Sequence, residues 1–343
     1  GTTANAQALT LNGGTSGTVA VAGAVGKTTS LRSLVLVNSN GATFGTAETD
    51  SVIAGTNLRI QNSQSGMAVT FNGPVVTPQF NADNGPYSLI FNGTGTDIGD
   101  NSGPDLSKAA ILNTGTVTLG NSGTDTLLFR NGLSITNASA VQLFGQISTY
   151  GAPATLGDHD TTVYLRSGSA KLDTTAGNAW PNGGTITLGG PVEGVSGGEN
   201  ITLIAGVLGD VLLVGSVGAT QRVGNVEITV ARNVVAQSIR AMRLLQTTGT
   251  GTTTLNGTVN TTSATGVDIT TTNIVVNALV TTIVDATVAA SAPGIVSLFA
   301  TATAPGATTG IITMLDPGRI VASNDVTLRA NRSTTPAILV YEA

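Results

Sequence analysis

The chain has 343 residues, of which 14 are Lys or Arg and 19 are Asp or Glu, so its net charge is -5. Only 10% of the residues are charged, against about 25% in a typical soluble domain, while 40% are hydrophobic and 45 are Gly. This balance is too apolar for a disordered chain and too acidic for a nucleic-acid-binding face, and the absence of Cys excludes thiolate metal sites, disulfides and a Cys nucleophile.

Short runs of β-branched and aliphatic residues recur along the whole chain, separated by Gly, Asn, Asp, Ser or Pro. Runs of this length between turn-forming residues are typical of strands, whereas the apolar periodicity of an amphipathic helix is nearly absent. The sequence therefore predicts an all-β protein. The clearest predicted strands are Leu31–Val37, Val117–Leu119, Thr126–Phe129, Ile186–Leu188, Val226–Val230, Ile274–Val276 and Ile311–Met314.

One motif repeats: an apolar residue, a Thr or apolar residue, a further apolar residue and then Asn-Gly. Asn72 and Asn92 of two copies lie 20 residues apart, and the segments Thr254–Asn260 and Ile274–Val280 align with an offset of about 21 residues. A period near 20 predicts a right-handed parallel β-helix, a β-solenoid of about 17 coils and about 80 Å in length. The copies are Leu9–Gly13, Val69–Gly73, Leu89–Gly93 and Thr253–Gly257, with a looser one at Leu127–Gly132.

A hairpin sheet is the competing interpretation, because Asn-Gly between strands is also a strong hairpin signal. The solenoid is favoured because the strands lack the regular apolar-polar alternation of a sheet with one wet face. The Thr-rich tracts Thr247–Thr254 and Thr261–Thr272 also suit polar positions stacked on successive coils. In such stacks side chains can form hydrogen bonds from coil to coil, and Asn at a turn tolerates left-handed backbone.

No segment is long or polar enough to separate domains, so we expect a single β-solenoid domain over residues 1–343. Irregular composition predicts loop excursions from the coil near residues 94–107, 151–160 and 173–200. The first excursion holds Asp97, Asp100 and Asp105, which are either a calcium site or a solvated turn; their spacing fits no calcium loop, which favours the turn.

A second polar cluster consists of Asp158, His159 and Asp160. It is either a His general base between carboxylates or an exposed turn, and the turn is favoured because adjacent residues of an extended chain point in opposite directions. We therefore expect no catalytic, cofactor-binding or metal-ligating residues, no cofactor and no enzymatic activity.

Two further features lie in the second half of the chain. Ile201–Ala219 is long enough to span a membrane, but Asp210 at its centre and four Gly residues favour two short strands around a turn, and we expect no membrane span. A basic cluster either contacts an anionic polysaccharide or a neighbouring subunit, or keeps other strands away from the sheet edge. This cluster comprises Arg222, Arg232, Arg240 and Arg243.

The segment Val223–Thr282 contains the stretch LQTTGTGTTTLNGTVNTTSATGVDITTTNI. It resembles the β-strand-repeat coils of bacterial surface proteins of the filamentous-haemagglutinin and autotransporter-passenger kind. The resemblance implies a right-handed parallel β-helix at the cell surface, with adhesive or structural roles and no shared catalytic residues. Arg240 and Arg243 depart from the small polar residues usual in such coils.

The expected function depends on the ends of the rod, where strand-like residues occur close to both termini and no capping helix is apparent. We predict an extracellular or cell-surface structural protein, exported with a signal peptide that is then removed. Its copies would assemble into a filament, fibre or sheath by stacking end to end or by strand donation. We expect Leu9, Leu11, Ile338 and Val340 at the junction. The alternative is a monomeric adhesin module that binds glycans, such as cell-surface polysaccharide, on a lateral face; neither prediction involves nucleic acid.

Overall fold

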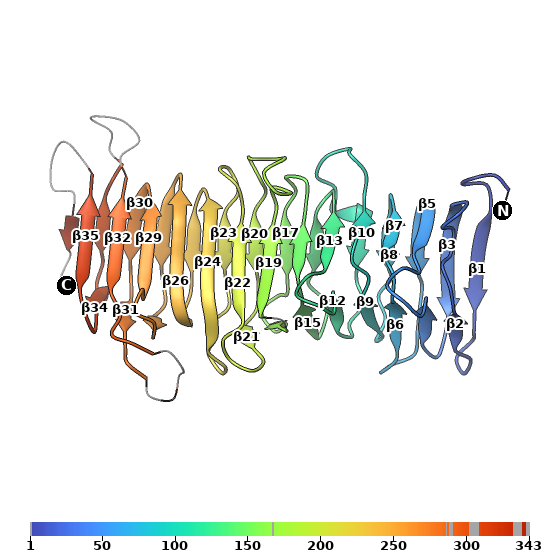
Figure 1. The fold of residues 1–343 in the computed structure, drawn as a ribbon, viewed down its shortest axis with the longest axis horizontal. Helices are drawn as coiled ribbons and strands as arrows, with labels where there is room; N and C mark the ends of the chain where they lie inside the picture. The colour runs from blue at the N-terminus through green and yellow to red at the C-terminus, as the bar shows by residue number, and fades with distance from the viewer. Residues whose placement is uncertain are drawn as a thin grey trace.

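The computed structural model describes residues 2–166, 168–285, 287, 291–301, 309–331 and 338–340. Over these residues the chain winds into an elongated rod, with the N-terminus at one end and the C-terminus at the other (Figure 1). All strand pairings between described strands are parallel, and one short 3-10 helix, η1 (Leu106–Lys108), interrupts the strands. The fold is therefore a parallel β-helix, as predicted, and the hairpin alternative is wrong for this part of the chain.

Each regular coil contributes three strands, so the rod has three faces. Face 1 consists of β2 (Val19–Val21), β4 (Ala42–Phe44), β6 (Ala68–Phe71), β9 (Ser88–Phe91), β12 (Val117–Leu119), β15 (Ala140–Leu143), β18 (Thr162–Leu165), β21 (Val192–Gly194), the start of β26 (Ile239–Gly249), β28 (Val259–Thr261), β31 (Leu279–Thr282) and β34 (Arg319–Val321).

Face 2 follows face 1 along the chain. It consists of the start of β5 (Val52–Ile60), β7 (Val75–Thr77), β10 (Thr96–Ile98), β13 (Thr126–Phe129), β16 (Gln146–Ser148), β19 (Ser169–Asp173), β22 (Asn200–Ile204), β24 (Val223–Ala231), the end of β26, β29 (Val267–Thr271), β32 (Val296–Ala300) and β35 (Val326–Ala330).

Face 3 completes each coil and contains fourteen strands in one ladder. They are β1 (Ala8–Asn12), β3 (Leu31–Asn38), the end of β5, β8 (Phe80–Ala82), β11 (Ala109–Ile111), β14 (Leu133–Ile135), β17 (Ala154–Leu156), β20 (Ile186–Leu188), β23 (Val211–Leu213), β25 (Val234–Ala236), β27 (Thr252–Leu255), β30 (Asn273–Val276), β33 (Ile312–Met314) and β36 (Ile338–Val340).

Coil length varies more than the sequence suggested. Hydrogen bonds join equivalent positions 19 residues apart at Asn233 and Thr252, but 38 residues apart at Asn273 and Ile311. The shortest coils match the expected period near 20, while the others carry longer corners. The rod therefore has fewer coils than the expected 17. At about 4.8 Å per coil, the face 3 ladder spans about 60 Å rather than 80 Å.

The Asn-Gly motif marks corners of the coil, although not one particular corner. Asn72 and Asn92 follow face 1, and the Asn92 side chain donates to the Asn72 side-chain oxygen at 3.0 Å. Asn256 and Asn277 follow face 3 and form the same bond at 2.8 Å. These ladders confirm the predicted periods of 20 and 21 residues. Among the described non-Gly residues, positive φ occurs at Asn5, Ala176 and Asn178 and not at these repeated Asn positions.

Every predicted strand is present, and the interior between the faces is filled by their inward side chains. The core changes character along the rod. Phe44, Phe71 and Phe91 occupy equivalent positions on face 1 and stack with ring centroids 5.0 and 5.6 Å apart. Phe80 and Phe129 pack edge-on against this stack.

Toward the C-terminus the core is lined by smaller and partly polar side chains. Its buried Thr and Gln residues include Gln246, Thr253, Thr261, Thr262, Thr271, Thr272 and Thr282. Several hydroxyls donate to carbonyl oxygens of neighbouring coils, as Thr271 does to Gly251 at 3.1 Å and Thr272 to Gly249 at 3.4 Å. This is the coil-to-coil bonding that the Thr-rich tracts predict.

Strands also occur inside the three predicted loop excursions. The first contains β10, the second β17, and the third β20 and β21. The segment Ile201–Ala219 forms β22 and β23 around a turn, which confirms the two-strand interpretation. No helix within the described residues is long and apolar enough to cross a membrane.

Candidate functional site

The N-terminal end of the rod exposes one edge of its first strands. β1 pairs with β3 and β2 pairs with β4, while no described strand lies on their other side. Their inward side chains pack against the core but remain only half-buried, in contrast to the fully buried equivalents further along the rod. These half-buried side chains are Leu9, Leu11, Val19 and Val21.

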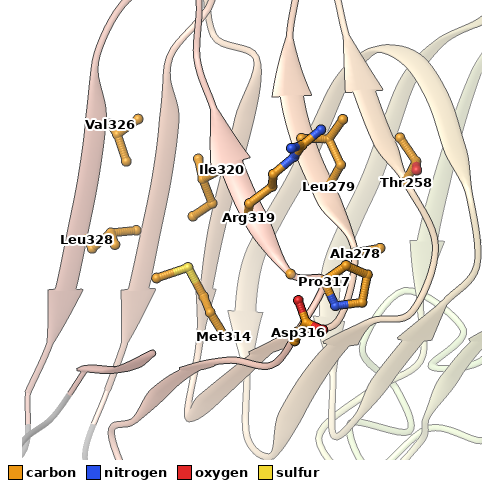
Figure 2. A pocket seen from close by; sticks show the side chains of 11 residues that line it. Thr258, Ala278, Leu279, Met314, Asp316, Pro317, Arg319, Ile320, Val326 and Leu328 are labelled. Carbon is orange, nitrogen blue, oxygen red and sulfur yellow. The ribbon is translucent and has the colours of Figure 1, made fainter. Parts of the chain in front are cut away.

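The C-terminal end has a similar open core. Met314, Ile320 and Leu328 are half-buried, and Figure 2 shows them gathered between the strands of the last coils. They line a cleft of about 900 Å³ together with Leu279 and Val326, among others. Val326 is 47% exposed, although it lies in a strand. The described part of this end therefore leaves apolar surface in contact with water.

The four predicted junction residues lie at opposite ends of one ladder. Leu9 and Leu11 belong to β1, the first strand of face 3, and pair with Leu34 and Leu36. Ile338 and Val340 belong to β36, the last described strand of the same face, and pair through the backbone with β33. The side chains of Ile338 and Val340 lie outside the described part of the chain.

The acidic loop does not bring its carboxylates together. The Asp97 carboxylate accepts two hydrogen bonds of 2.6 Å from the Arg130 guanidinium. Asp100 forms an ion pair with Lys108 at 3.0 Å, and hydrogen bonds from Ser102, Lys108 and Asn131 lower its pKa. Asp105 instead caps η1. Within the described residues, no group of three or more Asp, Glu or His side chains is arranged to hold a metal ion.

His159 lies on an exposed turn between β17 and β18. Its Nδ1 is 2.7 Å from the Asp160 carboxylate, and this hydrogen bond raises the pKa of the imidazole. The side chain is 98% exposed, so no cleft encloses the pair. Asp158 bonds to the Thr161 hydroxyl at 2.8 Å and stabilises the turn. The arrangement matches the exposed-turn interpretation.

The basic cluster separates into residues with different environments. Arg232 forms an ion pair with Asp210 at 2.7 Å. Arg222 is buried, donates to the Ala241 and Asn260 oxygens, and has a pKa lowered by desolvation. Arg240 makes two long bonds of 3.5 Å to backbone carbonyls. Arg222 and Arg232 are thus fixed by bonds between coils and do not form a continuous cationic surface.

Sequence reasoning missed a corner motif that organises the step from face 1 to face 2. The hexapeptides GTAETD (45–50) and GNSGTD (120–125) both begin at a Gly with φ near 80° and end at an Asp. The Asp50 carboxylate accepts the Thr46 amide at 2.8 Å, and Asp125 accepts the Asn121 amide at 2.6 Å. The repeated Gly and Asp spacing was the available signal.

Comparison with known proteins identifies no relative: no family model, curated protein or solved structure matches the chain. The site must therefore be interpreted from its own geometry.

Proposed function

We propose that this chain is an extracellular structural rod whose copies join end to end into a filament. The observation that carries the proposal is the matching construction of the two ends. Each presents strands of the parallel β-helix with an open edge among the described residues and with half-buried apolar side chains behind that edge. Heterologous contacts that repeat without closing build filaments.

The order of faces is the same at both ends, so a second copy can continue the coil without a change of direction. On face 3, β36 of one copy would lie beside β1 of the next and bring Ile338 and Val340 next to Leu9 and Leu11. On face 1, β34 would lie beside β2. On face 2, β35 would meet the segment around Val25, which already pairs with Val52 on its inner side.

The energetic support comes from the apolar side chains and from the lack of charge at the N-terminal edge. Full burial of an aliphatic side chain stabilises by about 1.5–3 kcal/mol relative to exposure. Burying the exposed parts of several half-buried side chains at the junction therefore gives a substantial driving force for assembly. Exposed edge strands usually carry Lys or another charge that prevents pairing. No charged residue precedes Lys27 in this sequence, so β1 and β2 lack this protection.

Two features support a structural rather than catalytic role and an extracellular setting. The acidic residues found together in sequence are held in separate ion pairs and caps, as at Asp97 and Asp105. The chain contains no Cys, which suits an oxidising exterior where stray thiols mispair.

Electron microscopy of the purified, tag-free chain at micromolar concentration tests the proposal. We expect long uniform filaments in negative stain. Leu11→Lys should abolish them, because it places a charge behind the open edge of β1, whereas Thr118→Lys on the outer surface of β12 in mid-rod should leave them intact. Because Leu11→Lys keeps its C-terminal end, a small fraction of it should also shorten wild-type filaments.

Circular dichroism and thermal melting must show that both variants keep the native fold. Dispersed single rods at all concentrations would contradict end-to-end assembly and leave lateral binding as the leading function. Normal filaments from Leu11→Lys would contradict the assigned junction.

A further inference from the structure

An aromatic stack lies at the corner between faces 2 and 3. Arg130, Tyr150 and Trp180 follow β13, β16 and β19, so they belong to successive coils. The Arg130 guanidinium carbon is 4.9 Å from the Tyr150 ring centroid, and the Tyr150 and Trp180 rings stack at 5.8 Å with planes 25° apart. Trp180 remains 47% exposed. The stack therefore presents apolar ring surface at the side of the rod that a ligand can contact.

The loop that carries Trp180 is held in place by a buried carboxylate. The Asp173 side chain is fully buried and accepts hydrogen bonds from the Thr175 amide and hydroxyl at 2.9 and 2.6 Å. The Trp180 amide donates to the Thr175 carbonyl at 2.9 Å, and the Gly183 amide donates to the Trp180 carbonyl at 2.9 Å. The ring is therefore positioned before any ligand arrives, which reduces the entropy cost of binding.

A shallow cleft of about 390 Å³ adjoins this stack on face 2, within the size range of small-ligand sites. Thr126, Leu128, Gln146 and Ser148 contribute to its lining from β13 and β16, and Tyr150 belongs to it as well. The cleft thus combines an aliphatic side chain, hydroxyl and amide groups and the Tyr150 ring. This is a surface that can bind both the apolar and the polar parts of one ligand.

The charges around the cleft are already paired within the protein. Asp97 is the one ionisable acid or base among its lining residues other than Tyr150, and it forms the two 2.6 Å bonds to Arg130. Lys171 on the adjacent coil is 3.2 Å from Asp173. A charged ligand would lose its hydration without gaining a free partner here. The cleft therefore favours a neutral ligand with many hydroxyls.

We propose that this cleft and the Tyr150–Trp180 stack bind a neutral polysaccharide chain. The C–H face of a sugar ring would pack on the exposed indole, and neighbouring sugar hydroxyls would bond to Gln146, Ser148 and the outer lone pairs of Asp97. The inference is independent of the proposed junction, because the cleft lies on the side of the rod and is present in a single copy as well as in a filament.

Trp180 provides a direct probe because it is the only Trp in the chain. Titration with neutral hexasaccharides, namely cellohexaose, maltohexaose, laminarihexaose and chitohexaose, should shift and quench its fluorescence for at least one of them. The affinity should not change between 50 and 500 mM NaCl, because no net charge is involved. No response to any of these four sugars at millimolar concentration would overturn the proposal. A salt-dependent response to oligogalacturonate alone would do the same, since it would indicate an anion site.

Variants locate the binding by calorimetry, which does not depend on the indole. Trp180→Ala should weaken the affinity about tenfold or more, as expected for an aromatic anchor, while Trp180→Phe should retain part of it. Tyr164→Ala is the matched control, because this ring on face 1 also has a guanidinium over it, that of Arg166 at 5.9 Å, but lies outside the cleft. Unchanged affinity in Trp180→Ala, or an equal loss in Tyr164→Ala, would refute the assigned site.

Discussion

The interior of the rod is filled by different kinds of side chain near its two ends. Near the N-terminus, the Phe44–Phe71–Phe91 stack fills the interior with large rings that hold one another in place. In the C-terminal coils, buried Thr residues line the interior, and several of them, such as Thr271 and Thr282, bond to backbone carbonyls. The same backbone geometry therefore tolerates an interior that is apolar and bulky or one that is small and partly polar. The backbone hydrogen bonds between parallel strands therefore define the coil, and the side chains packed inside it determine its local stability.

The largest expected loss of stability follows from a substitution in the aromatic stack near the N-terminus. Phe71 contacts the rings of Phe44, Phe80 and Phe91 and is fully buried, so Phe71→Ala should cost about 3–5 kcal/mol of unfolding free energy. Urea unfolding followed by circular dichroism measures this loss. Phe71→Leu, which leaves a smaller cavity, should cost clearly less. Equal losses for both variants would show that ring stacking and volume contribute little.

A smaller change in stability is expected at the Thr-rich end, where two Thr residues in register have different hydrogen-bond partners. Thr282 donates to the Gly294 carbonyl at 2.8 Å and accepts the Ser323 amide at 2.8 Å. Its register partner Thr261 is buried with no hydrogen-bond partner for its hydroxyl among the described residues.

Substitution by Val should therefore act in opposite directions at these two positions. Thr282→Val should destabilise the rod by about 1–3 kcal/mol, because it removes the two hydrogen bonds of the hydroxyl, to the Gly294 carbonyl and from the Ser323 amide, while Thr261→Val should be neutral or slightly stabilising. Thermal unfolding of the two variants measures both. The same sign at both positions would show that the hydroxyl bonds do not determine stability at this end.

The smallest effect is a response to acid. Burial alone would raise the pKa of Asp173, but hydrogen bonds from Thr175 and Gly177 and the nearby Lys171 ammonium outweigh it, so the pKa is lowered below 3.8. A carboxyl group with a lowered folded-state pKa stabilises the fold above its ordinary pKa, and this contribution is lost as the pH falls below that value. The Thr hydroxyls of the C-terminal coils do not titrate in this range.

Hydrogen exchange between pH 5 and pH 2.5 should accordingly show the loop after β19 losing protection before the coil containing Thr282, once intrinsic exchange rates are corrected. Asp173→Asn should remove the difference in acid response. Simultaneous loss of protection in both regions would indicate that the rod unfolds as one cooperative unit instead.

Much of the architecture was predictable from local patterns. The strands, their parallel order and the 20- and 21-residue steps follow from short β-branched runs and from the spacing of Asn72, Asn92 and the later Asn-Gly copy. The length of each coil was not predictable, because insertions at corners leave the strand pattern unchanged. The step between paired strands ranges from 18 residues, as at Val223 and Ala241, to 40 residues, as at Leu279 and Arg319.

The candidate sites were less accessible to sequence reasoning. Leu9 and Leu11 could be predicted as end residues because the first strand-like run contains them. The lateral cleft could not, since Asp97, Arg130, Tyr150 and Trp180 are separated by up to 83 positions and meet only because each follows a face 2 strand or lies in it. Their proximity depends on the exact number of residues in each corner, which composition does not determine.

The uneven coils have a further consequence. Each coil advances the rod by one strand spacing, whether it contains 19 or 38 residues. The length of the rod thus depends on the number of coils and not on the number of residues in the corners. A corner can acquire a new loop, such as the one bearing Trp180, without altering the reach of the molecule. The spacing between coils is therefore constant along the rod, while the loops on its outer surface can vary in length and sequence.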